Sequence, residues 1–134
     1  MWVPLEVIDF ASDCISHGVK AVSLGGGEPF EYEGVFDVID ALYSKCYLSV
    51  TSNGLPIENP QIWKMLTEHK PDKIHLTIHH PDDESEIRRI ERQLQCIGQI
   101  GIKPGLLKTD DIHPPKSVIS VHFFCLTCLM ALQI

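Results

Sequence analysis

The stretch AVSLGGGEPF, residues 21–30, decides the fold class. Its first four residues form a short apolar run typical of a buried strand, and the three glycines that follow allow the backbone to turn sharply. Comparable runs rich in apolar residues lie at residues 47–51, 74–78 and 102–107. Their nearly constant spacing predicts a repeating unit that contains one strand.

Helical patterns lie before and between these runs. Residues 4–16 carry apolar side chains at helical spacing, and Asn59 followed by Pro60 is typical of a helix start. We expect a longer helix from Pro81 to about Gly98. The apolar residues Val35, Val38, Ile39, Leu42 and Cys46 also recur at helical spacing and predict one apolar helix face.

The resulting order, helix then strand four times over, indicates parallel strands joined by helical crossovers. Such units build either a doubly wound sheet or a barrel, and a complete eightfold barrel needs about 250 residues. The chain has 134 residues, so four or five strands would form only part of a barrel. Because a helix precedes the first strand, we expect a preceding strand and its loop to be missing.

Composition excludes several classes of protein. The chain is 44% hydrophobic and 22% charged, as expected for a globular domain, and its formal net charge is −7. That charge belongs to residues 1–60, where acids predominate, while residues 61–134 are balanced. No basic stripe is present, so nucleic acid is not an expected partner. The amino-terminal residues lack the pattern of a signal peptide, which predicts a cytoplasmic protein.

The last part of the chain departs from the repeat. We place a domain boundary after residue 108, followed by a polar turn and an apolar tail, and a tail foreign to the domain is one of the alternatives. Residues 118–134 contain no Asp, Glu, Lys or Arg, but a membrane span is disfavoured because the run is short and contains His122 and Gln133. A buried strand and turn is the favoured interpretation. Cys125 and Cys128 form a CxxC pair, a weak candidate for metal binding.

Two loops are candidates for ligand binding. The first is Gly25–Phe30, and the second is Thr51–Leu55 after the next run. Each alone is typical of an ordinary turn, but tips of neighbouring parallel strands lie at the same edge of a sheet, where ligands bind. Dinucleotide and triphosphate binding are excluded because the chain lacks GxGxxG and Walker A motifs, and the acids after the glycines would repel phosphate.

A third loop, residues 79–84, follows the third run and contains two histidines and three acids. His79 or His80 is a candidate proton donor or metal ligand at the rim of a pocket. The favoured alternative is that Asp82 or Asp83 caps the next helix and the histidines are exposed turn residues.

The paired GGEP and TSNG motifs resemble the radical S-adenosylmethionine (radical SAM) superfamily, over roughly residues 4–107. The resemblance implies a parallel-strand partial (β/α) barrel of four to five βα units. It also implies that SAM is the small-molecule cofactor. The implied cofactor-binding residues are Gly26, Gly27, Glu28, Pro29, Ser52, Asn53 and His79.

The family also has a CxxxCxxC loop whose three thiolates hold a [4Fe–4S] cluster. That motif is absent from this sequence, so we expect a truncated member that binds SAM but is not competent alone in reductive SAM cleavage. The substrate is not indicated. The alternative is a non-catalytic α/β remnant or interaction module, because exposed sheet edges favour self-association.

Overall fold

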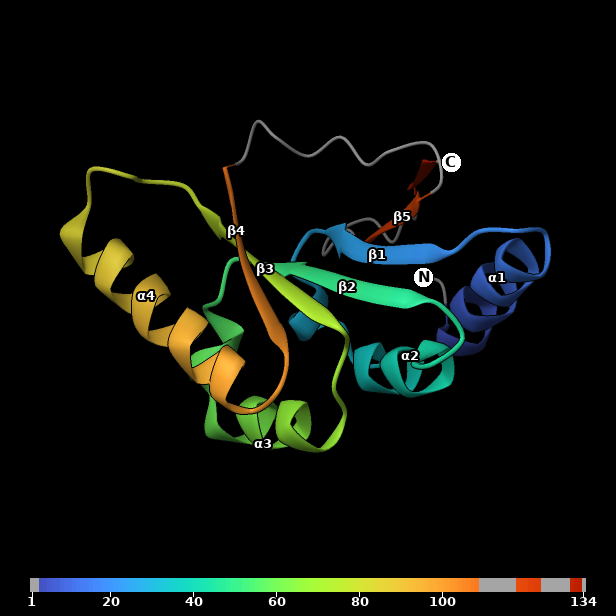
Figure 1. Cartoon of the computed structure of the whole chain (residues 1–134), viewed down its shortest axis with the longest axis horizontal. Coiled ribbons are helices and arrows are strands. Elements are labelled where there is room, and N and C mark those ends of the chain that lie inside the picture. The colour runs from blue at the N-terminus through green and yellow to red at the C-terminus, as the bar shows by residue number, and fades with distance from the viewer. Residues whose placement is uncertain (1–2, 109–117, 124–130, 134) are drawn as a thin grey trace.

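The computed structural model describes residues 3–108, 118–123 and 131–133 (Figure 1). Its helices are α1 (Pro4–Ser16), α2 (Val35–Leu42), α3 (Pro60–Glu68) and α4 (Glu84–Gln99). Its strands are β1 (Ala21–Gly26), β2 (Tyr47–Ser52), β3 (Lys73–Ile78), β4 (Lys103–Lys108), β5 (Val118–Phe123) and β6 (Ala131–Gln133). Two short 3-10 helices, η1 (Pro29–Glu31) and η2 (Pro56–Glu58), follow β1 and β2.

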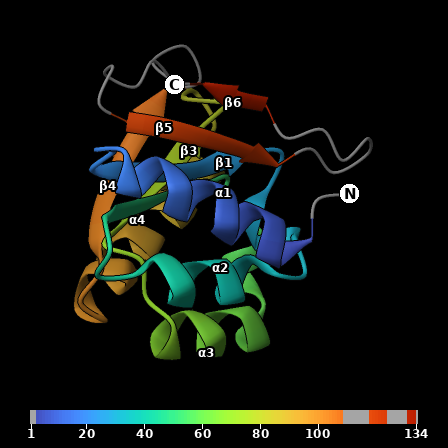
Figure 2. The same cartoon turned by 90° about the vertical axis from the view of Figure 1, so that its right-hand side faces the viewer.

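The described strands form one sheet in the order β4-β3-β2-β1-β5-β6. Strands β1 to β4 are parallel and adjacent in chain order, β5 runs parallel to β1, and β6 is antiparallel to β5. Strands β1 to β4 follow one another in chain order, so right-handed crossovers place their connecting helices on the same face of the sheet. Helices α2, α3 and α4 lie together on one side (Figures 1 and 2). The expected α/β fold of the partial-barrel type is therefore confirmed.

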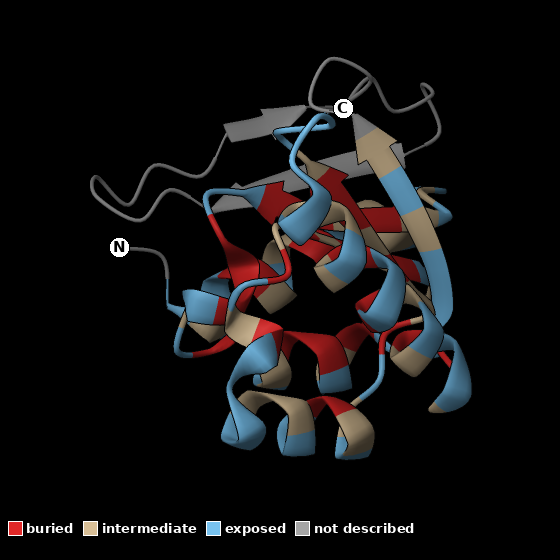
Figure 3. Ribbon diagram, turned by 90° about the vertical axis from the view of Figure 1, so that its left-hand side faces the viewer, coloured by how far each residue is buried: buried red, intermediate tan, exposed pale blue. Residues whose placement is uncertain are grey.

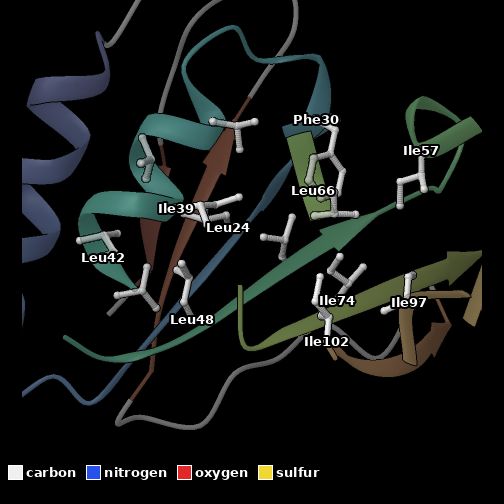
Figure 4. Packing of buried hydrophobic residues seen from close by; sticks show 14 of the residues in the cluster. Leu24, Phe30, Ile39, Leu42, Leu48, Ile57, Leu66, Ile74, Ile97 and Ile102 are labelled. Atoms are coloured by element: carbon white, nitrogen blue, oxygen red, sulfur yellow. The ribbon is translucent and has the colours of Figure 1, made fainter. Parts of the chain in front are cut away.

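The core lies between these helices and one face of the sheet. Leu24, Leu48 and Ile74 are fully buried on three neighbouring strands, and α2 and α3 contribute Ile39 and Leu66. Figure 4 shows these side chains pointing into one cluster, and Figure 3 marks in red the buried residues of the strands and helices. Burying each such side chain contributes about 1.5–3 kcal/mol, so the cluster holds the strand tips in place.

The starts of two helices follow from their capping residues. Asn59 Oδ1 accepts a hydrogen bond of 2.9 Å from the Gln61 amide, which confirms the helix predicted to begin at Pro60. Asp83 Oδ1 accepts one of 2.9 Å from the Ser85 amide, so α4 begins at Glu84 rather than at Pro81. Of the two candidate caps in this loop, Asp83 is therefore the one used.

The stripe predicted through Cys46 was wrong at its last member. Helix α2 ends at Leu42, and Ser44 has a φ of 69°, so the chain reverses before Cys46 can extend the helix. Helical spacing predicted that position as helical because a stripe does not reveal where the hydrogen-bonding ladder stops.

The end of the chain is described only in part. Strand β5 returns to pair with β1 instead of continuing outward beyond β4. Residues 109–117 and 124–130 lie outside the described residues, and with them Cys125 and Cys128, the candidate metal ligands. The domain boundary at residue 108 stays a prediction. In the part of the chain that is described, no helix has the length and apolar character needed to cross a membrane.

Candidate functional site

The three candidate loops meet at one edge of the sheet. Strands β1, β2 and β3 are parallel neighbours, so the turns that follow them lie side by side at their carboxyl ends. Ligands of parallel α/β proteins gather at this edge because the loops there provide free polar groups on a rigid support.

Glu28 joins the first two loops. Its side chain is buried, with 5% of the residue exposed. Its Oε1 accepts a hydrogen bond of 2.8 Å from Ser52 Oγ, and its Oε2 accepts one of 2.8 Å from the Asn53 amide. Oε1 also accepts a longer bond, 3.3 Å, from the Phe30 amide. Burial raises the pKa of Glu28, and these three donors partly oppose the rise.

The other predicted site residues divide into buried and exposed positions. Ser52 and Pro29 are buried, whereas Gly26 and Gly27 are exposed at the tip of β1. Gly26 has a φ of 99°, a left-handed conformation that favours glycine. Glu28 and Ser52 are therefore turned towards each other, and the exposed backbone of Gly26 and Gly27 is the part of this loop that faces solvent.

The turn after β3 is built differently. The His79 and His80 amides donate hydrogen bonds of 2.8 and 3.0 Å to the two carboxylate oxygens of Glu86 on α4. Both histidines are exposed, and His79 Nε2 lies 3.1 Å from Thr77 Oγ1. Glu86 was not found by sequence reasoning. Its position in the first turn of α4 is the only signal, and that position is equally typical of an ordinary helix start.

A pocket of about 330 Å³ lies between the β2 and β3 turns. Its lining residues include Asn53, Leu55, His79, His80, Glu86 and Arg89. Asn53 and His79, two predicted cofactor contacts, therefore line the same cavity. The pocket combines an apolar side chain with amide, imidazole, carboxylate and guanidinium groups, so it suits a polar small molecule with an apolar ring face.

His75 lies in the middle of β3. Its Nε2 is buried and has no hydrogen-bond partner among the described residues, and burial, with the nearby Lys73, lowers the pKa of its ring. The neutral imidazole is therefore the favoured form on this face of the sheet.

A [4Fe–4S] cluster does not fit the described residues. Cys14 lies in α1, Cys46 lies before β2 and Cys96 lies in α4, and burial raises the pKa of the Cys14 and Cys46 thiols. Within the described ranges, no three His, Cys, Asp or Glu side chains come together as a metal site. Thiolate ligands need the opposite environment, one that lowers the thiol pKa.

The fold and the paired loops agree with a family comparison. Residues 3–95 match the model of the radical SAM superfamily, and this range spans α1 through most of α4. The chain belongs to the radical SAM superfamily. No curated protein and no solved structure matches it. In this radical SAM chain, the matched residues include the GGEP loop, the TSNG turn and the β3 turn that surround the candidate site.

Proposed function

We propose that the carboxyl ends of β1, β2 and β3 form the SAM-binding portion of a radical SAM protein. Members of the superfamily use SAM for radical chemistry and bind small-molecule cofactors. In the family, bound SAM is the source of the carbon radical that abstracts hydrogen from a substrate. In this proposal the residues of this chain bind and orient SAM.

The observation that carries the proposal is the pair of hydrogen bonds that the Glu28 side chain accepts from the β2 turn. Two hydrogen bonds of 2.8 Å fix the loops after β1 and β2 relative to each other. The same contacts remove Glu28 and Ser52 from solvent, so the exposed backbone of Gly26 and Gly27 is left to hold the methionine end of SAM. Asn53 and His79 then line the neighbouring pocket for the nucleoside end.

Glycine is suited to this role because a side chain would separate the ligand from the backbone polar groups. A carboxylate at Glu28, held by three donors, gives the loop a fixed shape before SAM arrives. Binding then costs less ordering entropy than it would in a mobile loop.

Calorimetric titration with SAM tests the proposal. We expect the wild-type chain to bind SAM and Gly27→Val to abolish binding, because the branched side chain covers the exposed backbone. Gly26→Val should do the same, although its φ of 99° adds strain. Gly98→Val on α4 is the matched control, because Gly98 is exposed and an added Cβ meets only ordinary contact, 3.8 Å from Pro104. Absence of SAM binding by the folded wild-type chain would contradict the proposal.

We further propose that the chain alone does not carry out reductive SAM cleavage, since its described thiols lie on separate elements. Anaerobic reconstitution with iron and sulfide should leave no stoichiometric cluster absorbance. A stoichiometric [4Fe–4S] spectrum would contradict this part of the proposal.

A non-catalytic interaction module is the second candidate. It is favoured by β4, the end strand of the described sheet, where Leu106 is 52% exposed. An exposed strand with an apolar side chain pairs readily with another chain. This candidate predicts no SAM binding and a molar mass in light scattering that rises with protein concentration. Leu106→Lys should suppress that rise.

A further inference from the structure

We propose that Gln93 and Arg89, on the inner side of α4, are positioning residues for the SAM site. They hold the backbone of the β2 turn and so determine where Asn53 presents its side chain. This inference rests on the proposed function. Neither residue belongs to the loops that resemble the family motifs.

Gln93 is buried, with 4% of the residue exposed, although it is a polar residue on an amphipathic helix. Its Nε2 donates hydrogen bonds of 2.8 Å to the Gly54 carbonyl and 3.0 Å to Glu58 Oε1. Its Oε1 accepts a bond of 3.0 Å from Arg89 Nη1. A buried amide whose donor and acceptor atoms are all paired, one of them to the Gly54 carbonyl of the β2 turn, is well suited to fix that turn.

Arg89 reaches the preceding residue of the same turn. Its Nη1 donates a hydrogen bond of 3.0 Å to the Asn53 carbonyl. The carbonyls of Asn53 and Gly54 therefore both accept hydrogen bonds from α4. Arg89 also lines the pocket beside Asn53, so its guanidinium connects the turn to the cavity wall.

Gly54 is the residue that permits this contact. Its φ is 82°, and a Cβ at this position would overlap Gln93 Oε1 and lie 2.7 Å from Arg89 Nη1. The close approach of the two α4 side chains thus requires glycine for space as well as for backbone conformation.

The opposite side of the turn is held by Glu28, through Ser52 Oγ and the Asn53 amide. The loop after β1 therefore accepts hydrogen bonds from the donors of the β2 turn, and α4 donates hydrogen bonds to two carbonyls of the same turn. With both sides fixed, Asn53 Oδ1 accepts a hydrogen bond of 2.9 Å from the Leu55 amide, and both residues line the pocket. Loss of the α4 contacts would leave the buried Gly54 carbonyl and the half-buried Asn53 carbonyl without these partners, and the pocket wall would move to satisfy them.

Two variants and two matched controls test the inference. Gln93→Leu and Arg89→Met remove the hydrogen-bonding groups and keep the approximate volume. Gln95→Leu and Arg88→Met make the same changes at exposed positions of α4. We expect the first pair to weaken SAM binding about tenfold in calorimetry while the proteins remain folded, a loss equivalent to about 1.4 kcal/mol. The controls should bind SAM as the wild type does.

Amide hydrogen exchange separates positioning from general stabilisation. We expect Gln93→Leu to accelerate exchange at Gly54 and Leu55 while the amides of β1 and β3 keep their protection. If the variants lower the melting temperature but bind SAM with wild-type affinity, the role is merely structural and the inference is overturned. If the wild-type chain itself binds no SAM, the proposed function fails and the positioning role fails with it. Arg89 is only half-buried, so we expect Arg89→Met to fold even if Gln93→Leu does not. The measurement of SAM affinity on Arg89→Met then decides the test.

Discussion

The turn after β2 and the turn after β3 border the same pocket but are held in different ways. The β2 turn is bound from two sides by Glu28 and Gln93, both of which are at most 5% exposed. The β3 turn is exposed, and the amides of His79 and His80 donate hydrogen bonds to the Glu86 carboxylate on α4. One wall of the pocket is therefore fixed by buried polar contacts, and the facing wall is accessible to solvent.

This difference matters because a hydrogen bond contributes according to its surroundings. A buried donor that loses its partner cannot turn to water, whereas an exposed donor can. The β2 turn should therefore keep one conformation in the absence of a ligand. The β3 turn should adapt its two imidazoles to whatever occupies the pocket.

The largest expected effect comes from breaking the buried side. Glu28→Leu leaves the Ser52 hydroxyl and the Asn53 amide without their acceptor, so we expect the free energy of unfolding to fall by about 3 kcal/mol. Urea denaturation measures the change. Glu33→Leu is the control at an exposed position of the same loop, and we expect it to change stability by less than about 0.5 kcal/mol. Equal losses in the two variants would contradict the fixed-wall interpretation.

The next effect isolates the close approach of α4. Gly54→Ala should destabilise the chain by about 2 kcal/mol, because a positive φ and an occupied space act together. Gly18→Ala is the matched control, since Gly18 has a φ of 101° and nothing within 4 Å of an added Cβ. The excess loss at Gly54 over Gly18 measures the contact with α4, and no excess would show that the contact is not tight.

A smaller effect is expected on the exposed side. Glu86→Ala removes the acceptor of the His79 and His80 amides, which can bind water instead, so we expect a loss of about 1 kcal/mol or less. Glu91→Ala, at an exposed position of the same helix, is the control. Thermal unfolding gives both values. A loss as large as that of Glu28→Leu would remove the contrast between the two walls.

The pH dependence gives the most subtle test. Burial raises the pKa of Glu28 above its ordinary value of 4.5, so the folded chain binds this proton more tightly than the unfolded chain. Stability from this group is therefore complete below pH 4.5 and declines as the pH rises through the raised folded pKa. Glu28→Gln should flatten the decline in urea midpoints measured over that range. An unchanged slope would show that other groups cause it.

Much of the fold follows from local patterns. The runs at residues 47–51 and 74–78 lie within β2 and β3, and the Asn59 cap begins α3 as predicted. These features depend on neighbours in sequence: alternation with helices, a capping side chain and glycine at a turn. The prediction that the helix continues to Cys46 was wrong, because the apolar spacing continues beyond Leu42, where α2 ends.

The candidate site follows from the sequence only in part. The motif residues and their common edge were predicted, but the inward orientation of Glu28 was not. Gln93 was also missed, although a glutamine three residues after Ile90 falls on the apolar stripe of α4, and that anomaly was the available signal. The hydrogen bonds of Glu28 to Ser52 and of Gln93 to Gly54 join residues 24 and 39 positions apart. No local pattern specifies such partners.

The sequence by itself determined the repeating strand and helix units, the glycine turn after β1 and the resemblance to the radical SAM superfamily. These properties are encoded over short spans, where apolar periodicity and turn chemistry act directly. The tertiary structure decided that β1 pairs with β5, that Glu28 faces the β2 turn and that α4 holds that turn from the other side. Those outcomes depend on which buried polar groups satisfy one another once the sheet and helices have packed, because an unpaired group in that interior is costly.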